Sequence, residues 1–141
     1  MRAIVPLDGS PLAEEALPIV EALALKPLKH VQLCRAVDKA EDRAETIDYL
    51  QGIAGRLRLS GLEVTVDAVV GRAEAAIGTA AAGSDVVIMA THGRGGFDRL
   101  RHGSVTQYAL QELPLPILLV RAAGPHPEQK DPVAAVLTAG S

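Results

Sequence analysis

Short apolar runs alternate with amphipathic segments along most of this chain, and this alternation is the strongest constraint on its fold. The runs have the length of strands and lie at Arg2–Leu7, Val31–Val37, Leu62–Val70, Asp85–Ala90 and Ile117–Val120. A chain that alternates strands and helices builds a parallel sheet through right-handed crossovers, with helices on both faces. The pattern therefore predicts an α/β fold: a single doubly wound domain around a five-stranded parallel sheet.

The segments between the runs carry helix periodicity and recognisable ends. Helices are expected at 11–23, 47–57, 72–82 and 104–113. Ser10 is a good N-cap, and Pro11 suits the first helical position that follows it. Pro18 lies inside the same helix, where it removes a backbone hydrogen bond, and it predicts a kink near Glu14 rather than two helices.

The length of the chain, 141 residues, is that of one domain with one core. We place this domain at residues 1–121, because 122–141 contain three prolines and little apolar pattern. The C-terminal segment is expected to be a tail, although its short apolar run at 133–137 could dock on the domain.

Composition argues against several classes of partner. The longest apolar stretch, Leu113–Val120, has 8 residues including two prolines, whereas a membrane span needs about 20. The chain has 14 basic and 17 acidic side chains and only three aromatic residues, so no nucleic-acid surface is expected. Cys34 is the single cysteine and no signal-peptide pattern precedes the first strand, which favours a cytoplasmic protein.

Strand order decides where a ligand would bind. Five parallel strands most often take the order 3-2-1-4-5 or 2-1-3-4-5, and in both the ligand crevice lies beyond the carboxyl ends of the strands where the winding reverses. In the order 3-2-1-4-5, which we predict, the reversal falls between the first and fourth strands. These strands end at Asp8 and at the loop that begins with Thr91, the two most unusual polar clusters in the sequence.

The loop after the fourth strand has the composition of an anion site. Three arginines against one aspartate lie between His92 and His102. Four glycines let backbone N–H groups approach a ligand closely; they are Gly93, Gly95, Gly96 and Gly103. Ser104 then opens a helix whose free N–H groups favour phosphate, and it forms a capping box with Gln107. No P-loop motif is present, and we predict a phosphate cradle of another kind.

Two motifs resemble those of the universal stress protein family. Nucleotide-binding members carry G-x2-G-x9-G-[ST] after the fourth strand, and the corresponding residues here are Ala90, Gly93, Gly103 and Ser104. The opening Val5–Ser10, Val-Pro-Leu-Asp-Gly-Ser, is similar to the family's first strand and acidic turn. The resemblance covers about residues 1–121.

This resemblance implies a small dimeric module that binds ATP in the stress response. The implied fold is Rossmann-like, similar to that of adenine nucleotide alpha hydrolases, and the implied homodimer contact is the last strand, Ile117–Arg121. Mg2+ or Mn2+ would accompany the phosphates. By position, the residues near the nucleotide would be Pro6, Leu7, Asp8, Ala36, Met89, Ala90, His92 and Gly93, and Gly103, Ser104, Val105 and Thr106 would surround the phosphates.

Ala90 departs from the family motif and leaves a second hypothesis open. It stands where the motif has its first glycine, and one extra methyl in a closely packed site costs about 1–3 kcal/mol, or about 5–150-fold in affinity. The alternative is a universal stress protein that binds no nucleotide and acts as a dimeric interaction protein. Arg35 also stands where some relatives have a histidine, and the sequence alone assigns it no role.

Other chemistries fit the residues less well. Beyond Asp8 the sequence shows no general base or nucleophile pair directed at a γ-phosphate, so we expect no catalytic residue and at most slow ATP hydrolysis. A metal site built from Asp8, His92 and His102 matches no standard spacing. A receiver-like phosphoacceptor would need an aspartate and a lysine where Gly71 and Arg121 stand. A nucleotidyl transferase or hydrolase on the related fold is the remaining enzymatic alternative.

Overall fold

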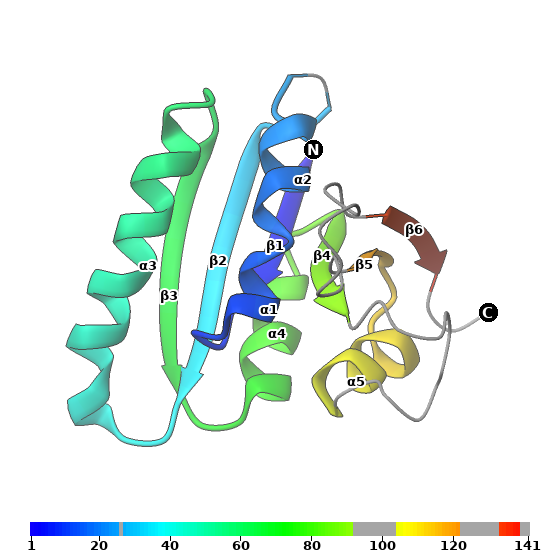
Figure 1. Ribbon diagram of the computed structural model, residues 1–141. Coiled ribbons are helices and arrows are strands. Elements are labelled where there is room, and N and C mark those ends of the chain that lie inside the picture. The colour runs from blue at the N-terminus through cyan, green and yellow to red at the C-terminus, as the bar shows by residue number, and fades with distance from the viewer. Residues whose placement is uncertain (26, 92–103, 122–132, 139–141) are drawn as a thin grey trace.

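The computed structural model describes residues 1–25, 27–91, 104–121 and 133–138, with Ser104 and 133–138 described as backbone. Its strands form one sheet in the order β3-β2-β1-β4-β5-β6 (Figure 1). They are β1 (Arg2–Pro6), β2 (His30–Val37), β3 (Glu63–Val70), β4 (Val86–Thr91), β5 (Pro116–Arg121) and β6 (Val133–Thr138). Neighbours among the first five are parallel, which confirms the predicted five-stranded sheet and its order.

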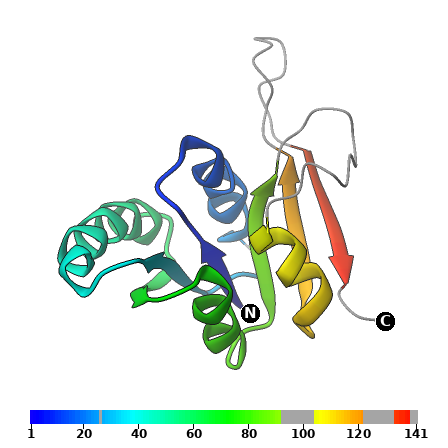
Figure 2. The ribbon, with the colours of Figure 1, turned by 90° about the horizontal axis from the view of Figure 1, so that it is seen from below.

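Helices cover both faces of this sheet, as Figure 2 shows. They are α1 (Pro11–Glu14), α2 (Leu17–Leu23), the 3-10 turn η1 (Ala40–Asp42), α3 (Arg43–Arg58), α4 (Ala73–Ala81) and α5 (Ser104–Glu112). Residues of α2 and α3 pack into one core cluster, and residues of α4 and α5 into another. Within the described ranges no helix has both the length and the apolar character needed to cross a membrane.

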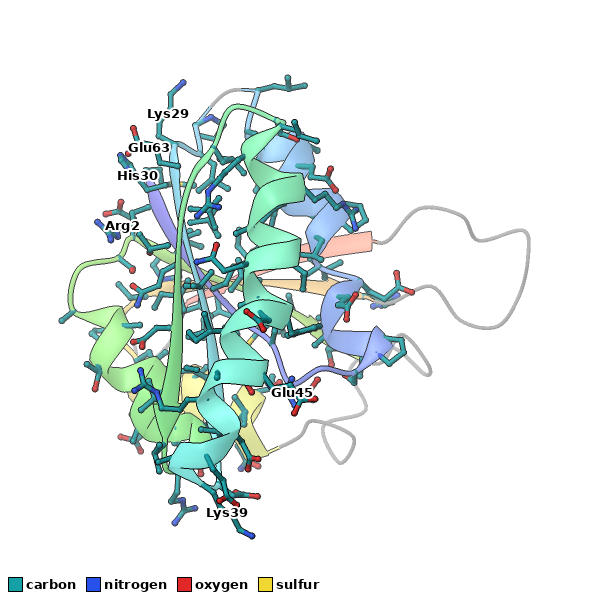
Figure 3. The ribbon with its side chains drawn as sticks, turned by 90° about the vertical axis from the view of Figure 1, so that its left-hand side faces the viewer. Arg2, Lys29, His30, Lys39, Glu45 and Glu63 are labelled. Atoms are coloured by element: carbon teal, nitrogen blue, oxygen red, sulfur yellow. The ribbon has the colours of Figure 1, made fainter. Side chains whose placement is uncertain are left out.

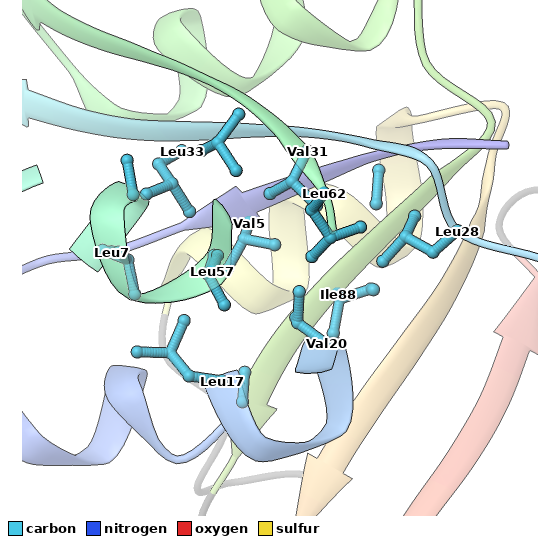
Figure 4. Packing of buried hydrophobic residues seen from close by; sticks show 14 of the residues in the cluster. Val5, Leu7, Leu17, Val20, Leu28, Val31, Leu33, Leu57, Leu62 and Ile88 are labelled. Carbon is cyan, nitrogen blue, oxygen red and sulfur yellow. The ribbon is translucent and has the colours of Figure 1, made fainter. Parts of the chain in front are cut away.

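Successive residues of the central strands face opposite sides of the sheet. Val5 belongs to the cluster beneath α2 and α3, together with Leu17, Leu33 and Leu57 (Figure 4). Ile4 belongs to the cluster beneath α4 and α5. Both strand residues are fully buried, because parallel strands lie between two layers of helices. This double burial explains why the strands appear in the sequence as uninterrupted apolar runs.

The first helical segment consists of two helices, so the prediction of one kinked helix is wrong. α1 ends at Glu14, and the next two N–H groups bond only three residues back, from Glu15 to Leu12 and from Ala16 to Ala13. α2 then begins with Pro18 in its first turn, where a missing N–H costs nothing. The proline therefore starts a helix instead of bending one.

The segment 122–141, which we expected to be a tail, contributes a sixth strand. β6 pairs antiparallel with β5 over all six residues, from Pro116 opposite Thr138 to Arg121 opposite Val133. β5 is therefore not the edge of the sheet, and a homodimer formed directly through Ile117–Arg121 is not compatible with this arrangement. Pairing of the apolar β5 removes an exposed edge that would otherwise invite uncontrolled association.

Candidate functional site

β1 and β4 are neighbouring parallel strands, as the predicted switch point requires. Ala3 is opposite Val86 and Ile4 is opposite Val87 in the parallel pairing of these strands. Continuing in the same direction, β1 ends in Pro6 and leads into Asp8, while β4 ends in Thr91. The helices that follow these two strands lie on opposite faces of the sheet, α2 in one core cluster and α5 in the other, and this is the arrangement at which doubly wound sheets bind ligands.

A polar hollow of about 500 Å³ lies at this edge, beyond the ends of β1 and β2 and beside the start of α3. Three segments line it, and their residues are Asp8 and Gly9; Arg35, Ala36, Val37 and Asp38; and Asp42, Glu45, Thr46 and Tyr49. In Figure 3 Glu45 lies toward the lower end of α3, far from His30 and Glu63 at the opposite edge of the sheet. The hollow is thus confined to the carboxyl edge.

Asp8 is held as an ionised carboxylate by the turn that follows β1. The backbone N–H of Ser10 donates to its Oδ1 at 2.8 Å, and Ser10 in turn accepts from the N–H of Ala13 at 3.2 Å as the N-cap of α1. Partial burial raises the pKa of Asp8, but the hydrogen bonds from the Ser10 hydroxyl and backbone, assisted by the charge of Arg35, lower this pKa below its usual value. Asp8 is an acceptor at neutral pH.

Arg35 rests against the turn at Gly9. Gly9 has φ +85°, a conformation that favours glycine. A Cβ at this residue would lie 2.9 Å from Nη1 of Arg35 and 3.1 Å from both Cζ and Nη2. Because these three distances are nearly equal, the guanidinium turns its flat face, and not its edge, toward Gly9.

Tyr49 supports the same guanidinium from α3. The Cζ atom of Arg35 lies 5.3 Å from the centroid of the Tyr49 ring, within range of a cation–π contact. The Tyr49 hydroxyl donates to Oε2 of Glu14 at 2.8 Å. Burial raises the pKa of Tyr49, the hydrogen bond and charge of Glu14 raise it further, and Arg35 opposes them. A chain of contacts therefore connects α1, α3 and the end of β2.

The structure brings together some of the predicted site residues. Asp8 and Ala36 line the same hollow, and Leu7, which is buried, donates its N–H to the Cys34 carbonyl at 2.9 Å. Pro6 is half-buried at the end of β1. Of these residues, Asp8 and Ala36 line the hollow, whereas Pro6 and Leu7 precede Asp8 in the chain and do not line it.

The remaining predicted residues lie on β4, in the loop after it and on α5. Met89 is buried in the cluster beneath α4 and α5, whereas Ala90 is half-buried and packs against the opposite cluster. Val105 packs against the same cluster as Met89, beneath α4 and α5, and Thr106 is buried. Ser104 is the first residue of α5. His92, Gly93 and Gly103 lie outside the described residues, as do the other glycines and the arginines of the predicted anion loop.

Sequence reasoning missed the contribution of α3. Glu45, Thr46 and Tyr49 of α3 line the hollow together with Asp42, the N-cap that precedes this helix, and their spacing of i, i+3, i+4 and i+7 is that of one helix face. The signal was therefore present as a polar stripe beside the apolar stripe of Leu50, Ala54 and Leu57. Arg35 was named but assigned no role, because the residues that contact its side chain are far from it in the sequence.

The charges of the hollow restrict what can occupy it. Four carboxylates and one guanidinium line it, on Asp8, Asp38, Asp42, Glu45 and Arg35. A multiply charged phosphate would be repelled there, since two like charges 4 Å apart cost about 4 kcal/mol near a protein surface. Hydroxyl and amine groups can donate to the carboxylates. Among the described residues no group of three or more His, Cys, Asp or Glu side chains could hold a metal ion.

A doubly wound parallel sheet defines a class of α/β proteins that bind small ligands at the carboxyl ends of their strands, which is the edge where the polar hollow lies. A model of the universal stress protein family matches residues 1–121. This chain belongs to the universal stress protein family.

Solved structures agree with this assignment. The hypothetical protein MJ0577 is 26% identical, with a TM-score of 0.72 over 87% of this chain and 96% of that one. UspA from Lactobacillus plantarum is 18% identical, with a TM-score of 0.71 over 86% and 97%. A universal stress protein in complex with cAMP is 17% identical, with a TM-score of 0.67 over 87% and 98%. A sequence search of curated proteins finds no match.

The contact between Gly9 and Arg35 predicts a specific stability difference. Gly9→Ala is expected to cost about 1–2 kcal/mol for the strain of a left-handed conformation, and in addition the cation–π contact that Arg35 loses when its guanidinium moves away from the new Cβ. Gly61→Ala is the control, since Gly61 has φ +93° but nothing within 4 Å of the added Cβ. Urea unfolding measures both losses. Equal losses would contradict the packing of Arg35 on Gly9.

The contacts of Tyr49 predict its titration. Because its pKa is raised in the folded protein, the stability that its protonated form contributes is present below about pH 10 and is lost as the pH rises through the folded pKa. In a Tyr108→Phe background, where Tyr49 is the one tyrosine, phenolate absorbance reports this midpoint. Glu14→Gln is expected to lower the midpoint and Arg35→Ala to raise it. The same midpoint in native and urea-unfolded protein would contradict the network.

Proposed function

We propose that this protein binds an adenine nucleotide, ATP, at the carboxyl ends of β1 and β4, and acts in the stress response as a binding module. The observation that supports this most strongly is the hollow lined by Asp8 and Ala36 at the carboxyl edge of the sheet, on the β2 side of the switch point. Membership of the family supports the class of ligand, as does the cAMP bound by one relative of the same fold.

The charges suggest how the nucleotide would be oriented. The carboxylates of the hollow favour the nucleoside, because its amine and ribose hydroxyls are donors. The phosphates would then extend from the hollow toward Ser104, Val105 and Thr106 at the start of α5, where the free N–H groups of the first helical turn attract anions. Mg2+ or Mn2+ would arrive with the phosphates. The proposal assigns no catalytic residue, and at most slow hydrolysis is expected.

Ala90 does not by itself argue against this site. Its methyl group packs against the core cluster beneath α2 and α3, so the fold already accommodates it. The second candidate function is that of an interaction module that binds no nucleotide because the methyl group of Ala90 closes the pocket.

Titration calorimetry with ATP and Mg2+ tests the proposal. The wild-type protein is expected to bind, and Asp8→Asn to bind about 10-fold or more weakly, since a hydrogen bond to a charged acceptor is worth about 1.5–3 kcal/mol. Asp85→Asn is the control, because Asp85 accepts from the Arg2 N–H at the opposite edge of the sheet. No binding by the wild type at millimolar ATP, with binding by Ala90→Gly, would establish the second candidate instead.

A homodimer is also part of the proposal, with its contact moved to β6. This strand has no charged residue and no proline within Val133–Thr138, and edge strands of such composition normally require a partner. Antiparallel pairing with a second β6 would satisfy the twofold symmetry of a homodimer. Sedimentation equilibrium is expected to give twice the chain mass of 14.7 kDa. A single-chain mass at all concentrations would contradict the dimer.

A further inference from the structure

The guanidinium of Arg35 has unused hydrogen-bonding capacity. It makes no hydrogen bond and no ion pair with any described residue, although it is half-buried and lines the hollow. Other arginines of the chain are engaged: Arg43 donates to the Ala68 carbonyl, and Arg56 pairs with Glu21. Arg35 instead contacts its neighbours through the face of the group, and no residue in the described ranges uses the N–H donors around its edge.

The position of this group is already restrained without a ligand. Gly9 lies against its flat face and the Tyr49 ring is 5.3 Å from its Cζ atom. Glu14 holds the Tyr49 hydroxyl at 2.8 Å. A free arginine side chain loses rotamer entropy when it binds, whereas a restrained one has lost part of it beforehand. Arg35 is therefore prepared to donate in a defined direction.

The charges around the Arg35 guanidinium restrict which ligand acceptors it can hydrogen-bond. Asp8, Asp38, Asp42 and Glu45 line the same hollow, so a polyphosphate at Arg35 would also face these carboxylates. The acceptors that fit are uncharged, and in a purine nucleotide they are the ring nitrogens of the base. Adenine presents the acceptor N7 beside its donor amine, so Arg35 can donate one hydrogen bond to a ring nitrogen while a carboxylate of the hollow accepts from the amine.

We propose that Arg35 recognises the base of the bound nucleotide by donating a hydrogen bond to one of its ring nitrogens, and that Tyr49 is the residue that positions Arg35. This inference rests on the proposed nucleotide binding and specifies which residue selects the base. Asp8 would then hold the ribose, and the start of α5 would hold the phosphates.

Titration calorimetry with adenosine, AMP and ATP separates contact with the base from contact with phosphate. Arg35→Ala is expected to weaken all three ligands by the same factor, about 10-fold or more. Arg35→Lys retains the charge and a donor but not the planar group that packs against Gly9 and the Tyr49 ring, so most of the loss should remain. Arg56→Ala is the control, because Arg56 pairs with Glu21 and does not line the hollow, and its affinities should equal those of the wild type.

A double-mutant cycle tests the role of Tyr49. Tyr49→Leu removes the ring and should lose nearly as much affinity as Arg35→Ala, whereas Tyr49→Phe keeps the ring and should lose less than about 3-fold. The double variant Arg35→Ala/Tyr49→Leu should bind no more weakly than Arg35→Ala alone, since Tyr49 acts through Arg35. Additive losses would show that Tyr49 does not act as a positioning residue.

The outcomes distinguish this inference from the proposed function. If the wild-type protein binds none of the three ligands, the proposed function fails and the inference fails with it. If the wild type binds but Arg35→Ala binds equally well, the role of Arg35 is overturned and the nucleotide site stands. A loss that grows with the number of phosphates would place Arg35 at the phosphates and also overturn the inference.

Discussion

β1 lies between β2 and β4 because the chain, after laying down β2 and β3 on one side, crosses back and adds β4 and β5 on the other. Right-handed crossovers then place α4 and α5 on the face opposite α2 and α3. Asp8 therefore leaves the central strand at the edge where such sheets bind ligands, and the hollow of the candidate site lies there, beyond the ends of β1 and β2 and beside α3. The candidate site depends on this central placement of β1.

Within this space the protein uses opposed charges rather than apolar walls. Asp8 is kept ionised by the N-terminal turn of α1, and the hollow contains more carboxylates than cations. Arg35 is the exception, and it is kept in place by an aromatic ring and a glycine instead of by an ion pair. A ligand with donors at one end and phosphates at the other is consistent with this division.

The parallel sheet, its order and most helix limits could be predicted, because burial on both faces and strong helix ends leave clear local patterns. α3 was expected at 47–57 and extends from Arg43 to Arg58. The division between α1 and α2 could not be predicted, since the sequence does not show whether Pro18 falls inside a helix or at its start. β6 was missed because its strand character appears only when the edge of β5 is there to pair with it.

The sequence by itself determined the alternation of strands and helices, the acidic turn at Asp8 and the family motif after β4, because each depends on residues that are near one another in the chain. Only the tertiary structure decided that Arg35 meets Gly9 and Tyr49, and that one face of α3 completes the hollow. These residues come from three different elements. Their contacts follow from how β1, β2 and α3 pack, which no local pattern encodes.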